Sequence, residues 1–481
     1  MPSSAQYPRD ESARSSASRG LDPNVGAHVR DHGKTATRPG RGVTTRVTDA
    51  RVILWGRRIG AVSWDGTRAL GVFQFDPAFV NAGIEVAPLT MPARETPYEF
   101  PALNRETFRG LPGMLADALP DRFGNRLIDA WLAETGKSPE AFNPVDRLCY
   151  IGRRGIGALE FEPALRKRTR ANRLEVARLV DLANRVLDER ANLAGRLDGK
   201  HDAEALEDIL SVGTSAGGAR AKAVLAWNPK TGEFRSGQHD AEPGFEHWLL
   251  KFDGVSDNRD GELADPEGYG RIEYAYARMA RAAGITMSEC RLHHEADRSH
   301  FMTKRFDRDG TGRKIHMQSL GAMRHFDFND PSAYSYEQAV MTIRDLGLGM
   351  VAVEEQFRRA VFNVVVRNQD DHVKNISFLM DRGGNWSLSP AYDVTYAYNP
   401  GGAWTRDHQM SLAGRRSGFE LDDILQFAAS IGMKRRRALE ILDEIGASVG
   451  DWEQHAGAAG VAPRDAARIE RSFRLNLTSG R

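Results

Sequence analysis

Three side chains near residue 370 have the types and the spacing that phosphoryl transfer needs. Asp370 lies in the segment RNQDDHVKNISF, Asn375 follows it five positions later, and Asp393 comes after a short expected hairpin, in LSPAYDVTY. In protein kinases an aspartate accepts the proton of the substrate hydroxyl, an asparagine five positions on holds Mg²⁺, and a later aspartate holds Mg²⁺ again. The pattern therefore predicts Asp370 as the catalytic base and Asn375 and Asp393 as metal ligands.

A glycine-rich segment upstream is a candidate for covering nucleotide phosphates. It reads SVGTSAGGARAKAVLAWNP over 211–229, with Gly217 and Gly218 at its centre. Backbone amides in such a turn can approach phosphates closely, because glycine has no Cβ. The segment is not a Walker A loop, since Ala219 stands where that motif requires lysine. A tight hairpin turn without a ligand is the alternative interpretation.

Lys251 and Glu273 are candidates for the lysine–glutamate pair that orients nucleotide phosphates in kinases. Lys251 ends the apolar run HWLLK, and Glu273 lies in an amphipathic segment over 271–285. Lys251 could instead be an edge-strand lysine that reaches water, and Glu273 a carboxylate favoured at a helix start. The stretch 299–310 falls where a hinge between two lobes would lie, so its backbone could contact adenine and Phe306 could stack on the base.

The expected elements divide the chain into four parts. Residues 1–44 read as a disordered tail, and 45–165 as an α+β unit with a three-stranded meander at 51–76, helices around Pro120, and a return to strand over 146–163. Residues 166–310 form the third part, in which a helical connector at 172–210 leads into the glycine-rich segment and the strands that follow it. The helix at 354–368 presents the catalytic loop within a helical part at 311–475, where 415–475 is helical throughout.

Composition limits the class of protein without naming a function. The chain has 481 residues and a net charge of +1, so no global electrostatic field favours binding to nucleic acid or membrane. The KRRR run at 434–437 reads as a solvated helix face, with a nucleic-acid-binding patch as the alternative. Its two cysteines are far apart, which argues against a disulfide framework. We find no apolar run of about 18 residues and no signal-peptide core. These features predict a cytoplasmic protein; an organelle transit peptide is disfavoured by the acidic residues of the tail.

The chain resembles the HipA family, the kinase toxins of bacterial type II toxin–antitoxin modules. The resemblance covers about residues 50 to 470 and is carried by GLPGMLADALPD, SAGGARAK, LLKFDG, TKRFDR, SYEQAV, NQDDHVKNISF and PAYDVTY. It implies a two-lobed kinase-like α+β fold with a small β-rich N-terminal subdomain and a helical C-terminal lobe. It also implies ATP and Mg²⁺ as cofactors and serine as the acceptor.

Residue by residue, the resemblance assigns the catalytic base to Asp370 and the metal ligands to Asn375 and Asp393. Lys251 falls on the nucleotide-phosphate lysine, Phe306 on the adenine side, and Ser215 on the autophosphorylated serine. Where Asp371 stands, family members often carry glycine or alanine. Asp371 is thus a second candidate for the base, although the spacing to Asn375 favours Asp370.

The resemblance further implies a helix-turn-helix antitoxin as a partner, contact with DNA only through that antitoxin, and an aminoacyl-tRNA synthetase as the protein substrate. Two other classes of function stay open from the sequence. One is a kinase-like protein that acts mainly by binding a DNA-binding partner. The other is a small-molecule phosphotransferase, since these enzymes share the Asp…Asn…Asp set.

Overall fold

The N-terminal subdomain is built on a four-stranded antiparallel sheet. The computed structural model describes residues 47–134, 136–165, 173–188, 208–213, 220–238, 242–255 and 268–478. In the sheet β1 (Asp49–Leu54), β2 (Arg57–Asp65) and β3 (Leu70–Phe75) form the predicted meander, and β4 (Leu159–Glu162) pairs with β1. Alternate residues of the strands pack with the short helices α1 (Pro77–Val80), α2 (Arg105–Phe108) and α3 (Gly113–Ala116).

Pro120 separates two helices as predicted, but the strand expected over 146–163 is mostly wrong. Residues Pro144–Ile151 form the helix α5, and only β4 at the end of the segment is a strand. The reason is local: Asn143 and Asp146 form a reciprocal capping box around Pro144, which starts a helix despite the β-branched and aromatic residues that follow.

A six-stranded sheet forms the next part, in the order β5-β7-β6-β8-β10-β9. Its strands are β5 (Arg173–Leu174), β6 (Lys222–Trp227), β7 (Phe234–Ser236), β8 (Glu246–Lys251), β9 (Cys290–Glu295) and β10 (Arg298–Lys304). The helices α4 (Arg122–Glu134) and α6 (Val176–Asp188) share a hydrophobic core with one face of this sheet. The helix α8 (Tyr269–Ala282) contacts β9 and β10, and Gly270 lets its backbone approach β10 closely.

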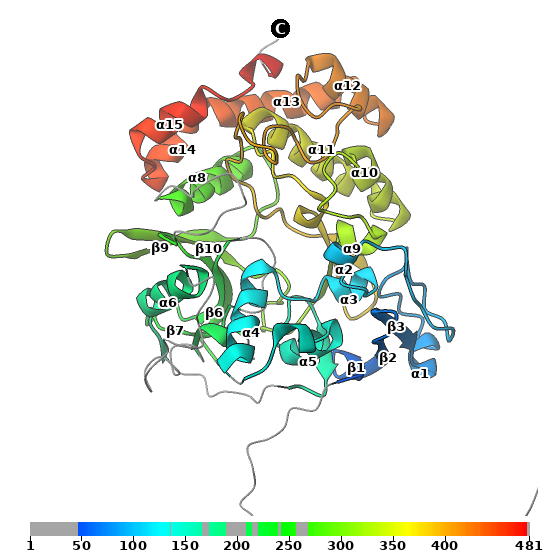
Figure 1. The fold of residues 1–481 in the computed structure, drawn as a ribbon. Helices are drawn as coiled ribbons and strands as arrows, with labels where there is room; N and C mark the ends of the chain where they lie inside the picture. The colour runs from blue at the N-terminus through cyan, green and yellow to red at the C-terminus, as the bar shows by residue number, and fades with distance from the viewer. Residues whose placement is uncertain are drawn as a thin grey trace, which may run out of the picture. The chain divides into compact units, whose positions relative to one another are not determined.

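The C-terminal lobe is mainly helical, as predicted, and holds the largest core. Its small sheet has the order β11-β12-β13, with strands His316–Ser319, Ser377–Met380 and Trp386–Leu388. The helices are α9 (Leu320–Arg324), α10 (Tyr336–Asp345), α11 (Gly349–Val366), α12 (Leu421–Ser430), α13 (Arg435–Gly450), α14 (Trp452–Ala459) and α15 (Pro463–Glu470). Short 3₁₀ turns lie at Val373–Asn375 and Leu475–Leu477 in this lobe and at Pro139–Ala141 in the N-terminal subdomain. Figure 1 shows α11 lying among the other helices of this lobe.

These elements confirm the expected α+β class, with a β-rich N-terminal subdomain and a helical C-terminal lobe. The predicted tail at 1–44 and part of the helical connector at 172–210 lie outside the described residues. Among the described helices, none is long and apolar enough to cross a membrane.

Candidate active site

The predicted catalytic loop begins where the buried helix α11 ends. Arg367 adopts the left-handed conformation with φ of 62°, and its N–H bonds to the carbonyl of Asn363, which stops the helix and turns the chain. Asn375 follows in a 3₁₀ turn, and its side-chain amide donates to the backbone carbonyl of Asp370 at 2.7 Å. The loop therefore fixes the Asn375 side chain against the backbone of Asp370.

Asp393 emerges from the β12–β13 hairpin and lies near Asn375. Both residues line the same pocket, together with His372 and Tyr392. Asp393 has a φ of 52°, so its backbone adopts the left-handed conformation that most residues avoid. Such strained backbone clusters at functional sites, where the surrounding structure enforces it.

Lys251 joins the two lobes at this site. Its ammonium donates to Glu273 Oε1 of α8 at 2.6 Å and also contacts a carboxylate oxygen of Asp393. The edge-strand interpretation of Lys251 is therefore wrong, because the residue is buried and paired. It lies on one face of β8, while Trp248 and Leu250 lie on the other face, in the hydrophobic core. The predicted pair of Lys251 and Glu273 is confirmed.

The charges of this cluster determine its protonation. Burial raises the pKa of Asp393, but the positive charges of Lys251 and Lys222 outweigh that effect and lower it to about 2. Burial disfavours the charged form of Lys251, but Asp393 and Glu273 outweigh this and raise its pKa above the ordinary value. At neutral pH Asp393 is thus an ionised carboxylate that can act as an oxygen ligand, and Lys251 is fully protonated.

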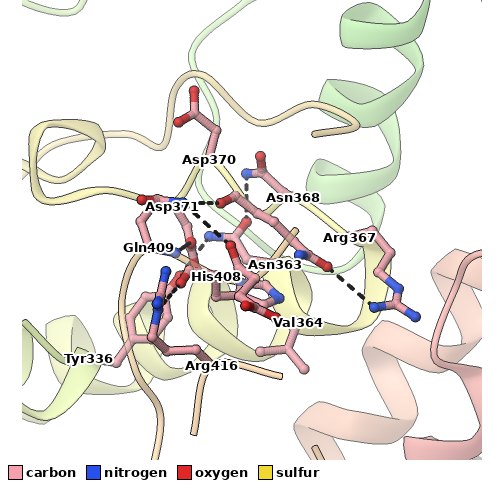
Figure 2. Close-up of polar contacts among 12 residues, drawn as sticks. Tyr336, Asn363, Val364, Arg367, Asn368, Asp370, Asp371, His408, Gln409 and Arg416 are labelled. Carbon is pink, nitrogen blue, oxygen red and sulfur yellow. Dashed lines mark hydrogen bonds and ion pairs between the residues drawn. The ribbon is translucent and has the colours of Figure 1, made fainter. Parts of the chain in front are cut away.

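Asp370 and Asp371 are neighbours in sequence with opposite environments. The side chain of Asp370 is 30% exposed, and its Oδ1 accepts a hydrogen bond from Trp404 Nε1 at 2.8 Å. The side chain of Asp371 is 1% exposed; its Oδ2 accepts from Tyr336 and from His408 at 2.7 Å each, and its Oδ1 accepts from the Gln409 backbone at 2.8 Å. Figure 2 shows the Asp371 carboxylate inside this cluster and the Asp370 carboxylate pointing away from it.

A second contact of His408 defines its tautomer. Arg474, which carries only hydrogen-bond donors, lies 3.0 Å from His408 Nε2, so that nitrogen must accept. Nδ1 then carries the proton and donates to Asp371. Burial raises the pKa of Asp371, but the neighbouring His408 and the hydrogen bonds from His408, Tyr336 and Gln409 lower it below its ordinary value. Asp371 is therefore an ionised anchor that ties the catalytic loop to α10 and to residues 408–409.

Phe306 lies just after β10, in the expected hinge segment. Its ring centroid is 5.5 Å from that of Tyr392, the residue before Asp393. Tyr392 is held in turn by a hydrogen bond from its hydroxyl to the carbonyl of Lys374. Phe306 is thus partly buried at the edge of the same site. Ser215, Gly217 and Gly218 lie outside the described residues, so their predicted roles stay predictions.

Sequence reasoning did not predict that Asp121 and Lys222 pair beside the site. Asp121, from the segment before α4, pairs with Lys222 at the start of β6, with 3.5 Å between Oδ2 and Nζ. Lys222 is the register partner of Lys251. Sequence reasoning also missed Trp404, which fixes Asp370 by a hydrogen bond from a segment with no regular secondary structure. The motifs GLPGMLADALPD and SAGGARAK contained Asp121 and Lys222, but nothing local indicated that they meet.

The donor set fits a magnesium–nucleotide group. Asp393 provides an ionised carboxylate, and Asn375, whose amide nitrogen is used by the loop, provides a carboxamide oxygen; both are hard oxygen ligands of the kind that Mg²⁺ prefers. A second pocket is lined by the cations Lys251 and Arg220 and by the carboxylates of Asp253 and Glu273. Glu273 pairs with both cations.

Two family models match the chain over most of its described length. One is described as HipA N-terminal domain and matches residues 50–162; the other is described as HipA-like C-terminal domain and matches residues 214–452. The chain belongs to the HipA family. HipA of Shewanella oneidensis MR-1, solved with HipB and operator DNA as a toxin–antitoxin system, has a similar fold: TM-score 0.61 at 18% identity, covering 89% of this chain and 96% of that one.

Two further proteins are similar to parts of this HipA-family chain. A Haemophilus influenzae protein named "Putative kinase" is 29% identical over 144 residues, which are 27% of this chain and 42% of that protein. The chain thus matches about two fifths of that relative's length. The Helicobacter pylori proinflammatory kinase CtkA aligns with a TM-score of 0.30 at 10% identity, over 49% of this chain and 90% of that one.

Proposed function

We propose that this HipA-family chain is an ATP- and Mg²⁺-dependent serine/threonine protein kinase, the toxin of a type II toxin–antitoxin module. The observation that carries the proposal is the buried ammonium of Lys251, which contacts both Glu273 of α8 and Asp393 of the catalytic lobe. Kinases use a strand lysine paired with a helix glutamate to orient nucleotide phosphates, and a later aspartate to hold Mg²⁺.

Each side chain has a role that its environment supports. Lys251 would hold the phosphates, with Glu273 keeping it in position, and Asn375 and Asp393 would hold the metal. When bound, the magnesium–nucleotide supplies the transferable phosphoryl group and neutralises its charge. Phe306 would face the adenine, where an aromatic ring can stack on the base.

Asp370 is the better candidate for the base. It is partly exposed, and Trp404 orients its carboxylate, so it can accept the proton of an incoming serine or threonine hydroxyl. Asp371 is buried, and both of its oxygens already accept hydrogen bonds, which leaves it unsuited to a substrate. The two neighbouring carboxylates thus divide the work between proton transfer and support of the loop.

Regulation and partners follow from the same proposal. Ser215 would be the autophosphorylation site, and Gly217 and Gly218 would cover the nucleotide phosphates with their backbone amides. A phosphate on Ser215 would repel the nucleotide, and the cation of Arg220 at the end of that segment offers a binding partner for it. A helix-turn-helix antitoxin would bind the protein and connect it to DNA; the Shewanella HipA was solved in a complex with HipB and operator DNA. The protein substrate would be a translation factor such as an aminoacyl-tRNA synthetase.

Transfer of labelled γ-phosphate from ATP tests the proposal. Purified protein should label itself and selected proteins of a cell lysate, and both signals should vanish in Lys251→Met. Label on small molecules alone would indicate a small-molecule phosphotransferase. Binding of a DNA-binding partner without any label transfer would indicate a protein that acts by binding only.

A further inference from the structure

The N-terminal subdomain contributes a buried charge next to the active site. The Asp121 side chain is 4% exposed and the Lys222 side chain 2%, with their charged atoms 3.5 Å apart. A buried ion pair is weak evidence for stability, because the cost of taking both charges out of water can exceed their attraction. The pair therefore invites a specific role.

The sheet register places Lys222 beside the catalytic lysine. Lys222 of β6 is opposite Lys251 of β8, and directly opposed residues of an antiparallel pair point to the same face. The intervening partners, Ala223 and Leu250, belong to the core on the other face. Both lysine side chains therefore lie on the face of the sheet where Lys251 contacts Asp393. The charge of Lys222 interacts with those of Asp393 and Glu273 as well as with that of Asp121.

The segment that carries Asp121 contacts both lobes. Asp117, four positions earlier, accepts hydrogen bonds from the backbone N–H and the hydroxyl of Ser319, at 2.7 and 2.8 Å. Ser319 in turn caps α9 of the C-terminal lobe. On its own side, Asp121 accepts from the backbone of Gly124 at 2.6 Å, which fixes the carboxylate at the start of α4. The segment 117–121 is therefore anchored at both ends before it meets Lys222.

We propose that Asp121 is a positioning residue of the metal site, which holds the Lys222 ammonium and so limits the positive charge that Asp393 experiences. The inference rests on the proposed function, because it concerns Asp393 as a magnesium ligand. Without the Asp121 charge, the attraction of Lys222 would be directed more strongly to Asp393, where an ammonium competes with a divalent cation. The N-terminal subdomain would then be a working part of the kinase site.

The magnesium dependence of ATP binding, measured by calorimetry, tests this inference with the full-length protein. Asp121→Asn keeps the shape and the acceptor for Gly124 but removes the charge. We expect the Mg²⁺ concentration at half-maximal ATP binding to rise roughly 5-fold or more, the lower end of ordinary coupling between sites. The double variant Asp121→Asn/Lys222→Met should return to near the wild-type value, because the competing ammonium is gone.

A matched control separates positioning from stability. Asp146→Asn removes another buried carboxylate of the same subdomain, one that caps α5 and binds the Val47 backbone. It should lower the melting temperature and leave the magnesium dependence unchanged. An unchanged magnesium dependence in Asp121→Asn, or a rise that persists in the double variant, overturns the inference. Failure of the wild-type protein to bind ATP at any Mg²⁺ concentration overturns the proposed function, and the inference with it.

Discussion

Replacing each of the two neighbouring carboxylates by its amide separates catalysis from support. Asp371→Asn keeps the shape of a side chain whose oxygens accept from Tyr336, His408 and Gln409. The new NH₂ group must face at least one of these donors, so that a favourable contact becomes a repulsive one. Asp370→Asn instead retains an oxygen that can accept from Trp404.

The expected magnitudes differ strongly. A hydrogen bond to a buried charge is worth about 1.5–3 kcal/mol, and Asp371 accepts three of them. Because such terms are not additive, we expect Asp371→Asn to lower the free energy of unfolding by about 3 kcal/mol. Asp370→Asn should change it by roughly 1 kcal/mol or less, since its side chain is 30% exposed, but should lower phosphoryl transfer by about 100-fold or more.

Urea unfolding and label transfer on the same preparations give both quantities. Because unfolding of a chain with several cores need not be two-state, the transition of the C-terminal lobe is the one to compare. If Asp371→Asn abolished transfer with unchanged stability, Asp371 would be the base. If Asp370→Asn retained near wild-type transfer, the assignment of the base to Asp370 would be wrong.

Three further predictions follow from the site and its surroundings. Asp393→Ala should weaken ATP binding in the presence of Mg²⁺ and abolish the magnesium dependence of that binding, because one hard oxygen ligand is lost. Calorimetry with and without Mg²⁺ checks this, and an unchanged magnesium dependence would remove Asp393 from the metal site. Mass spectrometry of protein incubated with ATP and Mg²⁺ should find phosphate on Ser215, and a Ser215→Ala variant should lose it, whereas phosphate on Thr214 or Ser211 instead would contradict the assignment. Burial raises the pKa of Asp307, but Arg305 and Arg308 outweigh that effect and hold the pKa well below its ordinary value. The contribution of Asp307 to stability is therefore complete above about pH 4 and is lost as the pH falls further. Acid unfolding of Asp307→Asn should depend less on pH in that range than unfolding of the parent protein, and an equal dependence would refute this.

Features that depend on local sequence could be predicted. The spacing of Asp370 and Asn375 lies within one loop, and the helix before it and the hairpin after it have clear apolar patterns, so their order follows from residues a few positions apart. The meander at the N-terminus has turn residues between alternating strands. Lys251 was ambiguous from sequence alone, since a lysine at the end of an apolar strand can face water or a carboxylate.

Features that depend on distant contacts could not be predicted. The role of Asp371 is determined by Tyr336 and His408, which approach it only after α10 and the segment after β13 have packed. The pair of Asp121 and Lys222 joins two subdomains, and neither residue shows a local sign of its partner. The prediction of a strand over 146–163 was mostly wrong although the deciding signal is local. The capping box at Asn143 starts a helix and outweighs the β-forming residues after it.

A crystal structure with Mg²⁺ and a non-hydrolysable ATP analogue is the most direct test of the site as a whole. We expect the metal to lie between the side-chain oxygens of Asn375 and Asp393. The Lys251 ammonium should lie within hydrogen-bond distance of a phosphate while still paired with Glu273, and the Asp370 carboxylate should face the γ-phosphate. A nucleotide bound elsewhere, or a metal held by residues other than Asn375 and Asp393, would contradict these expectations.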